Sequence, residues 1–173
     1  MQIVAIDESK AKAYVLAAVF VDAHQAPSIR KSLKRVLLKG QRSVHFSSER
    51  DSRKKSIINV LKTLDFEAKV FVSTDPSEPA ARTWCLEQVV ATLKVESEYR
   101  IVLDRDEGYE ASDNRAITVA SRSAGLNREN THNHDEPEYE PLLWIPDAIA
   151  WCYSKNAEWR DRVSQMLSSN IEA

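Results

Sequence analysis

The chain has 173 residues, of which 43% are hydrophobic and 29% charged, and its formal net charge at pH 7 is −2. This length and composition are typical of one ordinary globular domain with room for a hydrophobic core. Three glycines are too few for a Gly-rich phosphate loop, and neither a G-x-G-x-x-G nor a Walker sequence occurs, which excludes the common nucleotide-binding motifs.

The cysteine content and the hydropathy pattern bear on location. Cys85 and Cys152 lie far apart and form no C-x-x-C pair, which indicates neither a zinc site nor a disulfide framework. No apolar run approaches the length of a membrane span, and the first one is broken by acids and lacks the basic leader of a signal peptide. We therefore expect a cytoplasmic protein without a membrane partner, and the sequence leaves its oligomeric state open.

The first apolar segment, residues 3–6, ends at Asp7 and Glu8, and a second apolar run follows at residues 14–21. An unbroken apolar run of strand length is typical of a strand that is covered on both faces. The short spacing predicts an antiparallel hairpin with Asp7 at or just past the end of a central strand. A carboxylate buried there is unfavourable unless a cation or a hydrogen-bond donor receives it.

The next elements follow from periodicity and from turn residues. We expect helices from Gln25 or Pro27 to Leu38, from Ser47 or Ser48 to about residue 64, from Pro79 to Lys94, from Asp113 or Asn114 to Val119, and from Leu142 to Tyr153 with a continuation beyond it. Strands are expected at residues 68–73 and 99–103, with a short edge strand at residues 43–46.

Residues 124–141 are polar and show no periodicity, so we expect a long, mobile loop there. Neither internal repeats nor a clear linker is present, which predicts one domain over residues 1–173. Strands that alternate with helices after an initial hairpin indicate an α/β fold with a mixed sheet.

A basic segment lies between Arg30 and Lys55. It holds ten Lys and Arg residues against two acids, a charge of +8, so the rest of the chain carries −10. Such a segment is suited to nucleic-acid phosphates, for which Arg50, Arg53 and Lys54 are the candidates. The solvated faces of two amphipathic helices would give the same pattern.

Three carboxylates are candidates for one site. Asp7 and Asp104 each follow an apolar strand, and Asp147 falls in the first turn of the last helix, next to Pro146. Carboxylates that converge repel one another unless a cation neutralises them. Oxygen ligands favour Mg²⁺ or Mn²⁺, and a pair of such ions is suited to phosphodiester hydrolysis. Helix caps and surface ion pairs would explain each acid singly.

Two histidine features offer alternatives. His132 and His134 form a His-x-His pair that suits zinc or nickel, but it lies in the expected loop, where no helix or strand would fix its geometry. His45 is a candidate to position a phosphate or a water molecule, although a hydrogen-bonded histidine beside the core residue Phe46 is the simpler explanation.

Several motifs together resemble the RNase H-like superfamily. The Asp7-Glu8-Ser9 ending of the first strand resembles the uncharacterised bacterial "domain of unknown function" branch that begins with an Asp-Glu-Ser motif. Val44-His45-Phe46, the strand that ends in Asp104, and the closing helix around Asp147 are similar to segments of that branch.

The resemblance implies a mixed sheet with helices packed on it and a metal-dependent nuclease-type site. It implies Asp7, Asp104 and Asp147 as ligands, with Glu8 and Asp113 as auxiliary acids. The basic helical region before the third strand leaves open which later strand neighbours the first, so Asp75 is a rival to Asp104.

These observations give two main hypotheses. The first is a nuclease that hydrolyses RNA or DNA at a carboxylate-held Mg²⁺ or Mn²⁺ site. The alternative is a catalytically inactive RNase H-like module that binds nucleic acid or regulates. A small-molecule hydrolase that uses the His-rich segment is a third, weaker hypothesis.

Overall fold

A computed structural model describes residues 1–127 and 130–173. The strands are β1 (Gln2–Lys10), β2 (Tyr14–Asp22), β3 (Glu67–Ser73), β4 (Tyr99–Asp104), β5 (Thr131–Asp135) and β6 (Leu167–Glu172). The α-helices are α1 (Ala26–Lys34), α2 (Asp51–Leu61), α3 (Glu78–Ala91), α4 (Glu110–Ser123), α5 (Trp144–Lys155) and α6 (Ala157–Val163). Short 3₁₀ turns lie at η1 (Phe46–Ser48), η2 (Pro141–Leu143) and η3 (Ser164–Met166).

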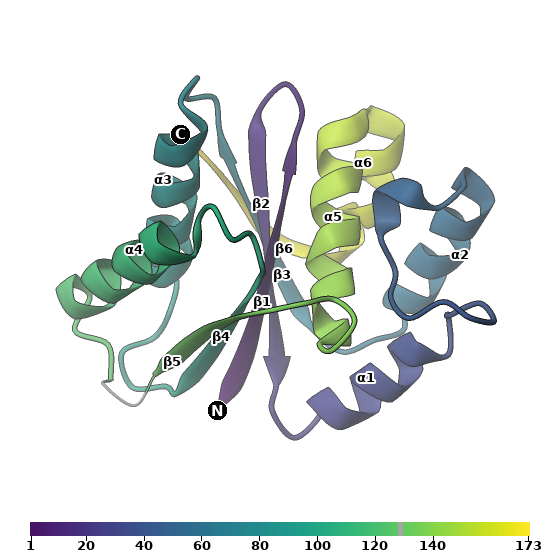
Figure 1. Cartoon of the computed structure of the whole chain (residues 1–173), viewed down its shortest axis with the longest axis horizontal. Coiled ribbons are helices and arrows are strands. Elements are labelled where there is room, and N and C mark those ends of the chain that lie inside the picture. The colour runs from purple at the N-terminus through teal and green to yellow at the C-terminus, as the bar shows by residue number, and fades with distance from the viewer. Residues whose placement is uncertain (128–129) are drawn as a thin grey trace.

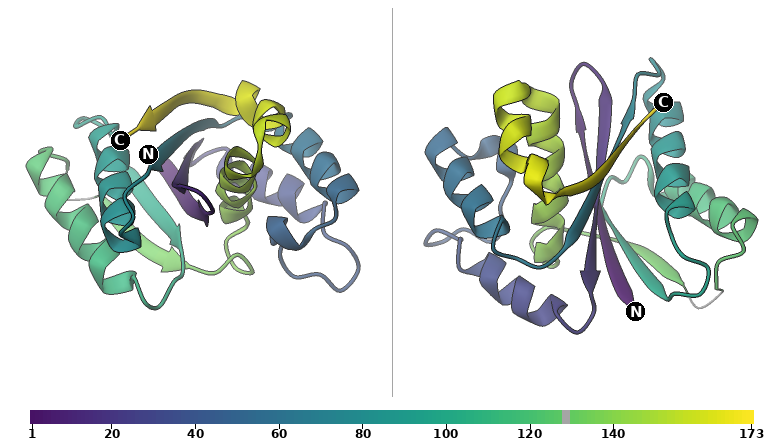
Figure 2. Two further views of the ribbon diagram at one scale, coloured as in Figure 1. Left: turned by 90° about the horizontal axis from the view of Figure 1, so that it is seen from above. Right: turned by 180° about the vertical axis from the view of Figure 1, so that it is seen from behind.

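The strands form one mixed sheet in the order β5-β4-β1-β2-β3-β6. The first three strands make an antiparallel meander, and β4 joins the free edge of β1 in the parallel direction. β5 continues the parallel arrangement beyond β4, and β6 pairs parallel with β3 at the opposite edge, as the view from behind in Figure 2 shows. The predicted α/β fold with a mixed sheet and helices packed on it is confirmed, and the arrangement is consistent with an RNase H-like fold.

Helices cover both faces of the sheet, which Figure 1 shows nearly edge-on. One face packs against α1, α2, α5 and α6, and the other packs against α3 and α4. Side chains alternate along a strand, so Ile3 and Ala5 of β1 belong to the first core and Val4 and Ile6 to the second. This alternation explains the unbroken apolar run that predicts β1.

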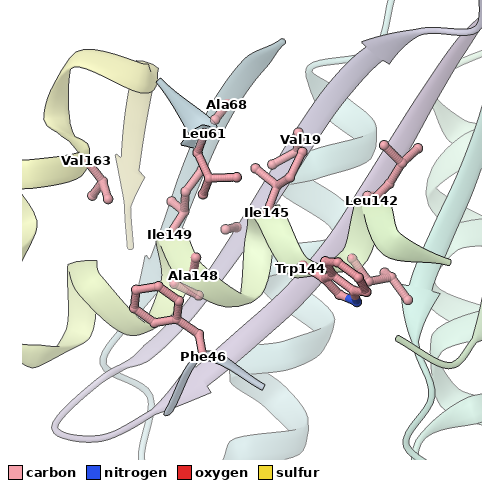
Figure 3. Close-up of a cluster of buried hydrophobic side chains, with 14 of the residues drawn as sticks. Val19, Phe46, Leu61, Ala68, Leu142, Trp144, Ile145, Ala148, Ile149 and Val163 are labelled. Atoms are coloured by element: carbon pink, nitrogen blue, oxygen red, sulfur yellow. The ribbon is translucent and has the colours of Figure 1, made fainter. Parts of the chain in front are cut away.

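Helix α5 forms the centre of the larger core (Figure 3). Ile145 and Ile149 are fully buried, and burial of each such side chain contributes roughly 1.5–3 kcal/mol. Ala148 and Ala150 are also fully buried, and their small size allows the helix to lie close to β1 and β2. The sheet and this core therefore hold α5, and Asp147 with it, in a fixed position.

The polar segments at the edges of the sheet differ from what the sequence predicts. Residues 43–46 form no strand; Phe46 instead begins η1. Residues 131–135 of the expected loop 124–141 form strand β5, so the prediction of a loop was wrong for these five residues. Residues 128–129 of the same loop lie outside the described residues. Strand β6 was not expected either. Within residues 1–127 and 130–173, no helix combines the length and apolar character needed to cross a membrane.

Candidate carboxylate site

The first two carboxylates of the site come from neighbouring parallel strands. β1 and β4 are paired up to Ile6 and Leu103, so Asp7 and Asp104 are each one residue beyond the last paired position. Alternation along the strands places both side chains on the α5 face of the sheet. The later strand that neighbours β1 is therefore β4. Asp75 follows β3, beyond β2, and its Oδ1 accepts a hydrogen bond from the Ser77 N–H.

The third carboxylate comes from the helix above that face. Asp147 lies in the first turn of α5, and its Oδ2 accepts a 2.8 Å hydrogen bond from the backbone N–H of Phe46. This bond ties the segment before α2 to α5. Pro146 costs the helix little, because the first N–H groups of a helix have no intrahelical partner.

The electrostatics show that these carboxylates act on one another. Burial, and then repulsion from Asp147, Glu8 and Asp104, raise the pKa of Asp7 well above its ordinary value, although the Glu8 N–H, 2.7 Å from Oδ1, opposes the rise. Burial and the charges of Glu8 and Asp147 raise the pKa of Asp104 to about 6. The pKa of Asp147 is also raised, mainly by burial.

His45 supplies a cationic neighbour to this cluster when it is protonated. Its charge would lower the pKa of both Asp104 and Asp147, and the imidazole itself is exposed. Its Nε2 lies 3.3 Å from the Ser43 hydroxyl. The auxiliary role of His45 stays a prediction.

The side chains of this site can be compared with the ligands that a metal ion requires. Carboxylate oxygens on one face suit a hard cation such as Mg²⁺ or Mn²⁺, and Asp7, only 8% exposed, has the most to gain from one. In the described part of the chain, however, no group of three or more His, Cys, Asp or Glu side chains is placed to hold an ion as it stands. The chemistry of the donors fits, but their side chains would have to close around the ion.

Glu8 and Asp113 lie on the opposite face of the sheet from Asp7. There the Arg82 guanidinium donates to both carboxylate oxygens of Asp113, at 2.7 and 2.8 Å, and lies 2.8 Å from Glu8. Arg82 also donates to the Tyr14 hydroxyl, and Asp113 is 2.9 Å from His134 Nε2. The prediction of Asp113 as an auxiliary acid at the metal site was therefore wrong: it belongs to a buried ion network. The Glu8 side chain shares that network and acts on Asp7 and Asp104 through its charge, while the Glu8 backbone N–H donates to Asp7.

Asp135 is a further carboxylate on this face, and the sequence pattern does not reveal it. Strand β5 pairs Asp135 with Asp104, and its alternation places both on the same face, while His134 points to the other one. Asp7, Asp104 and Asp135 thus lie side by side on the neighbouring strands β1, β4 and β5. Asp104 and Asp135 are the last residues of their strands, whereas β1 continues to Lys10, so Asp7 lies inside its strand and not at or past its end as expected. The polar run 131–135 lacks the apolar alternation that reveals a strand, although an acid after a parallel strand is the signal that identified Asp104.

The His-x-His pair is also placed by β5. His132 and His134 share one face of the strand, and burial, followed by the charge of His134, lowers the pKa of His132. His134 is bonded to Asp113. This arrangement gives no support to a zinc or nickel site.

The candidate phosphate-binding residues have three different environments. Arg50 is exposed. Arg53 donates to the carbonyl oxygen of Val36 at 2.8 Å and pairs with Glu49. Lys54 is 5% exposed, donates to the Glu49 carbonyl oxygen, and lies 4.6 Å from the ring centroid of Trp151. The prediction of a phosphate contact by Lys54 was wrong, because this ammonium group is buried in the protein's own core.

Comparisons with known proteins add no assignment. A scan against models of protein families gives no match, and a search of curated proteins finds no similar sequence.

Proposed function

We propose that this protein is a metal-dependent nuclease of RNase H-like type, which hydrolyses phosphodiester bonds of RNA or DNA with Mg²⁺ or Mn²⁺. The Asp-Glu-Ser ending of β1 supports its placement in the bacterial branch named above. The two described cysteines are buried and unpaired, which supports a reducing, cytoplasmic location.

One observation carries the proposal. Asp7 is buried in the central strand β1, and the charged groups that most affect its pKa are three other carboxylates. A protein gains nothing in stability from such an arrangement, since desolvation and repulsion both oppose the ionised form. A bound divalent cation would reverse both effects.

The roles of the residues follow from their positions. A bound divalent ion supplies Lewis-acid stabilisation of the phosphate and activates a water molecule. Asp7 and Asp104 would hold the ion from the sheet, and Asp147, which accepts a hydrogen bond from the Phe46 N–H, would hold it from α5. His45, whose charge acts on Asp104 and Asp147, is the candidate to donate a hydrogen bond to a phosphate oxygen.

The test is a cleavage assay with labelled single-stranded, duplex and RNA–DNA hybrid substrates, in Mn²⁺ and in EDTA. We expect cleavage in Mn²⁺ only, and a loss of more than about a hundredfold in Asp7→Asn, because that change removes a charged ligand. Asp65→Asn is the matched control, since Asp65 is exposed and the same charge is removed. Cleavage that survives EDTA or Asp7→Asn would rule out the metal mechanism.

A second candidate function is a nucleic-acid-binding or regulatory module without turnover. The observation that favours it is that, within the described residues, no three acidic, His or Cys side chains are already arranged around an ion position. Salt-sensitive binding without cleavage in Mg²⁺ or Mn²⁺ would support this module.

A further inference from the structure

A groove lined by cations opens beside the carboxylate site. It has a volume of about 710 Å³ and lies between the tip of the β1–β2 hairpin, η1 and the ends of α5 and α6. Its basic residues are Lys10, Lys12, Lys155 and Arg160, and none of its described lining residues is acidic. In a chain of net charge −2, an acid-free groove with four basic residues is suited to an anion.

The groove continues two of the elements that carry the carboxylates, β1 and α5, and the segment at η1 that binds Asp147. On β1, Ser9 lines the groove two residues after Asp7 and on the same face of the strand. Ser47 follows Phe46, whose N–H binds Asp147. On α5, four residues correspond to a rise of about 6 Å, so Trp151 lies one turn and Lys155 two turns beyond Asp147. The groove therefore begins where the row of acids ends.

The four basic residues are not equally available. Lys10 forms ion pairs with Glu8 and Glu78, and Arg160 donates twice to the Tyr153 carbonyl oxygen at the end of α5. Lys12 and Lys155 are exposed, at opposite walls of the groove. These two ammonium groups are the best placed to bind a ligand.

The aromatic residue of the groove has its ring surface covered by its own neighbours. Trp151 meets Phe46 and Trp159 edge to face, with ring centroids 5.4 and 5.2 Å apart. The ammonium groups of Lys54 and Lys155 lie 4.6 and 5.6 Å from its centroid. Trp151 therefore packs the wall of the groove, and little of its ring is left for stacking on a base.

We propose that this groove binds the nucleic-acid phosphates adjacent to the phosphodiester bond that is cleaved at the carboxylate site; the inference rests on the proposed function. Lys12 and Lys155 contact the phosphates, while Arg160 and the Ser and Asn side chains complete the wall. Recognition is of the backbone, so affinity does not depend on base sequence. The track runs along the β1–β2 hairpin and α5, and the basic residues of segment 30–55 do not line it.

The experiment measures binding apart from cleavage. Fluorescein-labelled 12-nucleotide RNA, DNA and duplex probes are titrated in EDTA by fluorescence anisotropy, at several salt concentrations. The test variant is Lys12→Glu/Lys155→Glu, and the control is Lys62→Glu/Arg115→Glu, two exposed residues outside the groove with the same charge change. Far-ultraviolet circular dichroism verifies that both variants fold.

We expect the test variant to bind at least about tenfold more weakly, and its plot of log affinity against log salt to be shallower by about 1.4, as for two lost phosphate contacts on a single strand. The control should change affinity less than about twofold, since charges more than about 8 Å from the ligand are screened at physiological salt. Equal losses in both variants, or a wild-type protein that binds none of the probes, would overturn the groove assignment. Binding that depends on the groove, without cleavage in Mn²⁺, would instead refute only the nuclease.

Discussion

Replacement of Asp104 by Asn should stabilise the metal-free protein at neutral pH. Burial and the charges of Glu8 and Asp147 raise the pKa of Asp104 from its ordinary value, about 3.9, to about 6. A difference of two in pKa corresponds to about 3 kcal/mol in the free energy of unfolding. Asp104 is partly exposed, so solvent screening reduces the expected gain to roughly 1–2 kcal/mol.

The pH dependence of this gain has a definite sign. Because the folded state holds the Asp104 proton more tightly than the unfolded state, the ionised carboxyl lowers the stability of the wild-type protein as the pH rises from about 4 to about 6. Asp104→Asn has no such titration. The difference in stability between the two proteins should therefore be small near pH 4 and reach its full size above pH 6, where the variant is the more stable.

Urea unfolding followed by tryptophan fluorescence, in EDTA at pH 4.5 and pH 8, measures the difference. Asp65→Asn, at an exposed position, controls for the loss of one negative charge. A variant that is less stable than the wild type at pH 8 would refute the reasoning, because the carboxylate would then be stabilised by a partner rather than repelled. Saturating Mn²⁺ should reverse the order, since a ligand that binds only the folded wild type at a hundred times its Kd adds about 2.7 kcal/mol.

Two further predictions concern the ion network and the missed acid. Arg82→Met should reduce the free energy of unfolding by about 3–5 kcal/mol in urea titrations, because it leaves Asp113, 1% exposed, without its bidentate partner. Adding Asp113→Leu should recover most of that loss, and a double variant no better than the single one would contradict this account. Asp135→Asn should weaken Mn²⁺ binding about tenfold or more, measured by the Mn²⁺-induced rise in melting temperature, whereas unchanged affinity would exclude Asp135 from the site.

The parts of the fold that bury apolar residues could be predicted from the sequence. The apolar runs of β1, β2 and β4 are covered on both faces, and the acids at their ends are visible because they interrupt those runs. The same reasoning finds Asp147, because α5 is apolar on nearly every side. For these elements local pattern and tertiary burial agree.

The edge strands and the fate of the charged side chains could not be predicted. β5 and β6 lie at the edges of the sheet, where half-buried polar residues leave no period in hydropathy. Lys54 occupies a helix position that looks solvated, but in the fold its ammonium lies against Trp151, a residue almost a hundred positions later in the chain. Asp113 likewise meets Arg82 only through the packing of α4 on α3.

The neighbouring residues Asp7 and Glu8 project from opposite sides of one strand, one toward other acids and the other toward Arg82. A slip of β1 by one residue would exchange them, because every side chain then changes face. Asp7 would lose its place in the row of acids, and the shorter aspartate would stand in the position from which Glu8 reaches Arg82. Hydrophobic alternation discriminates poorly between registers in a strand whose two faces are equally apolar. In the native register Glu8 keeps its ion pair with Arg82, and a β1–β2 hairpin shifted by one residue would lose that pair.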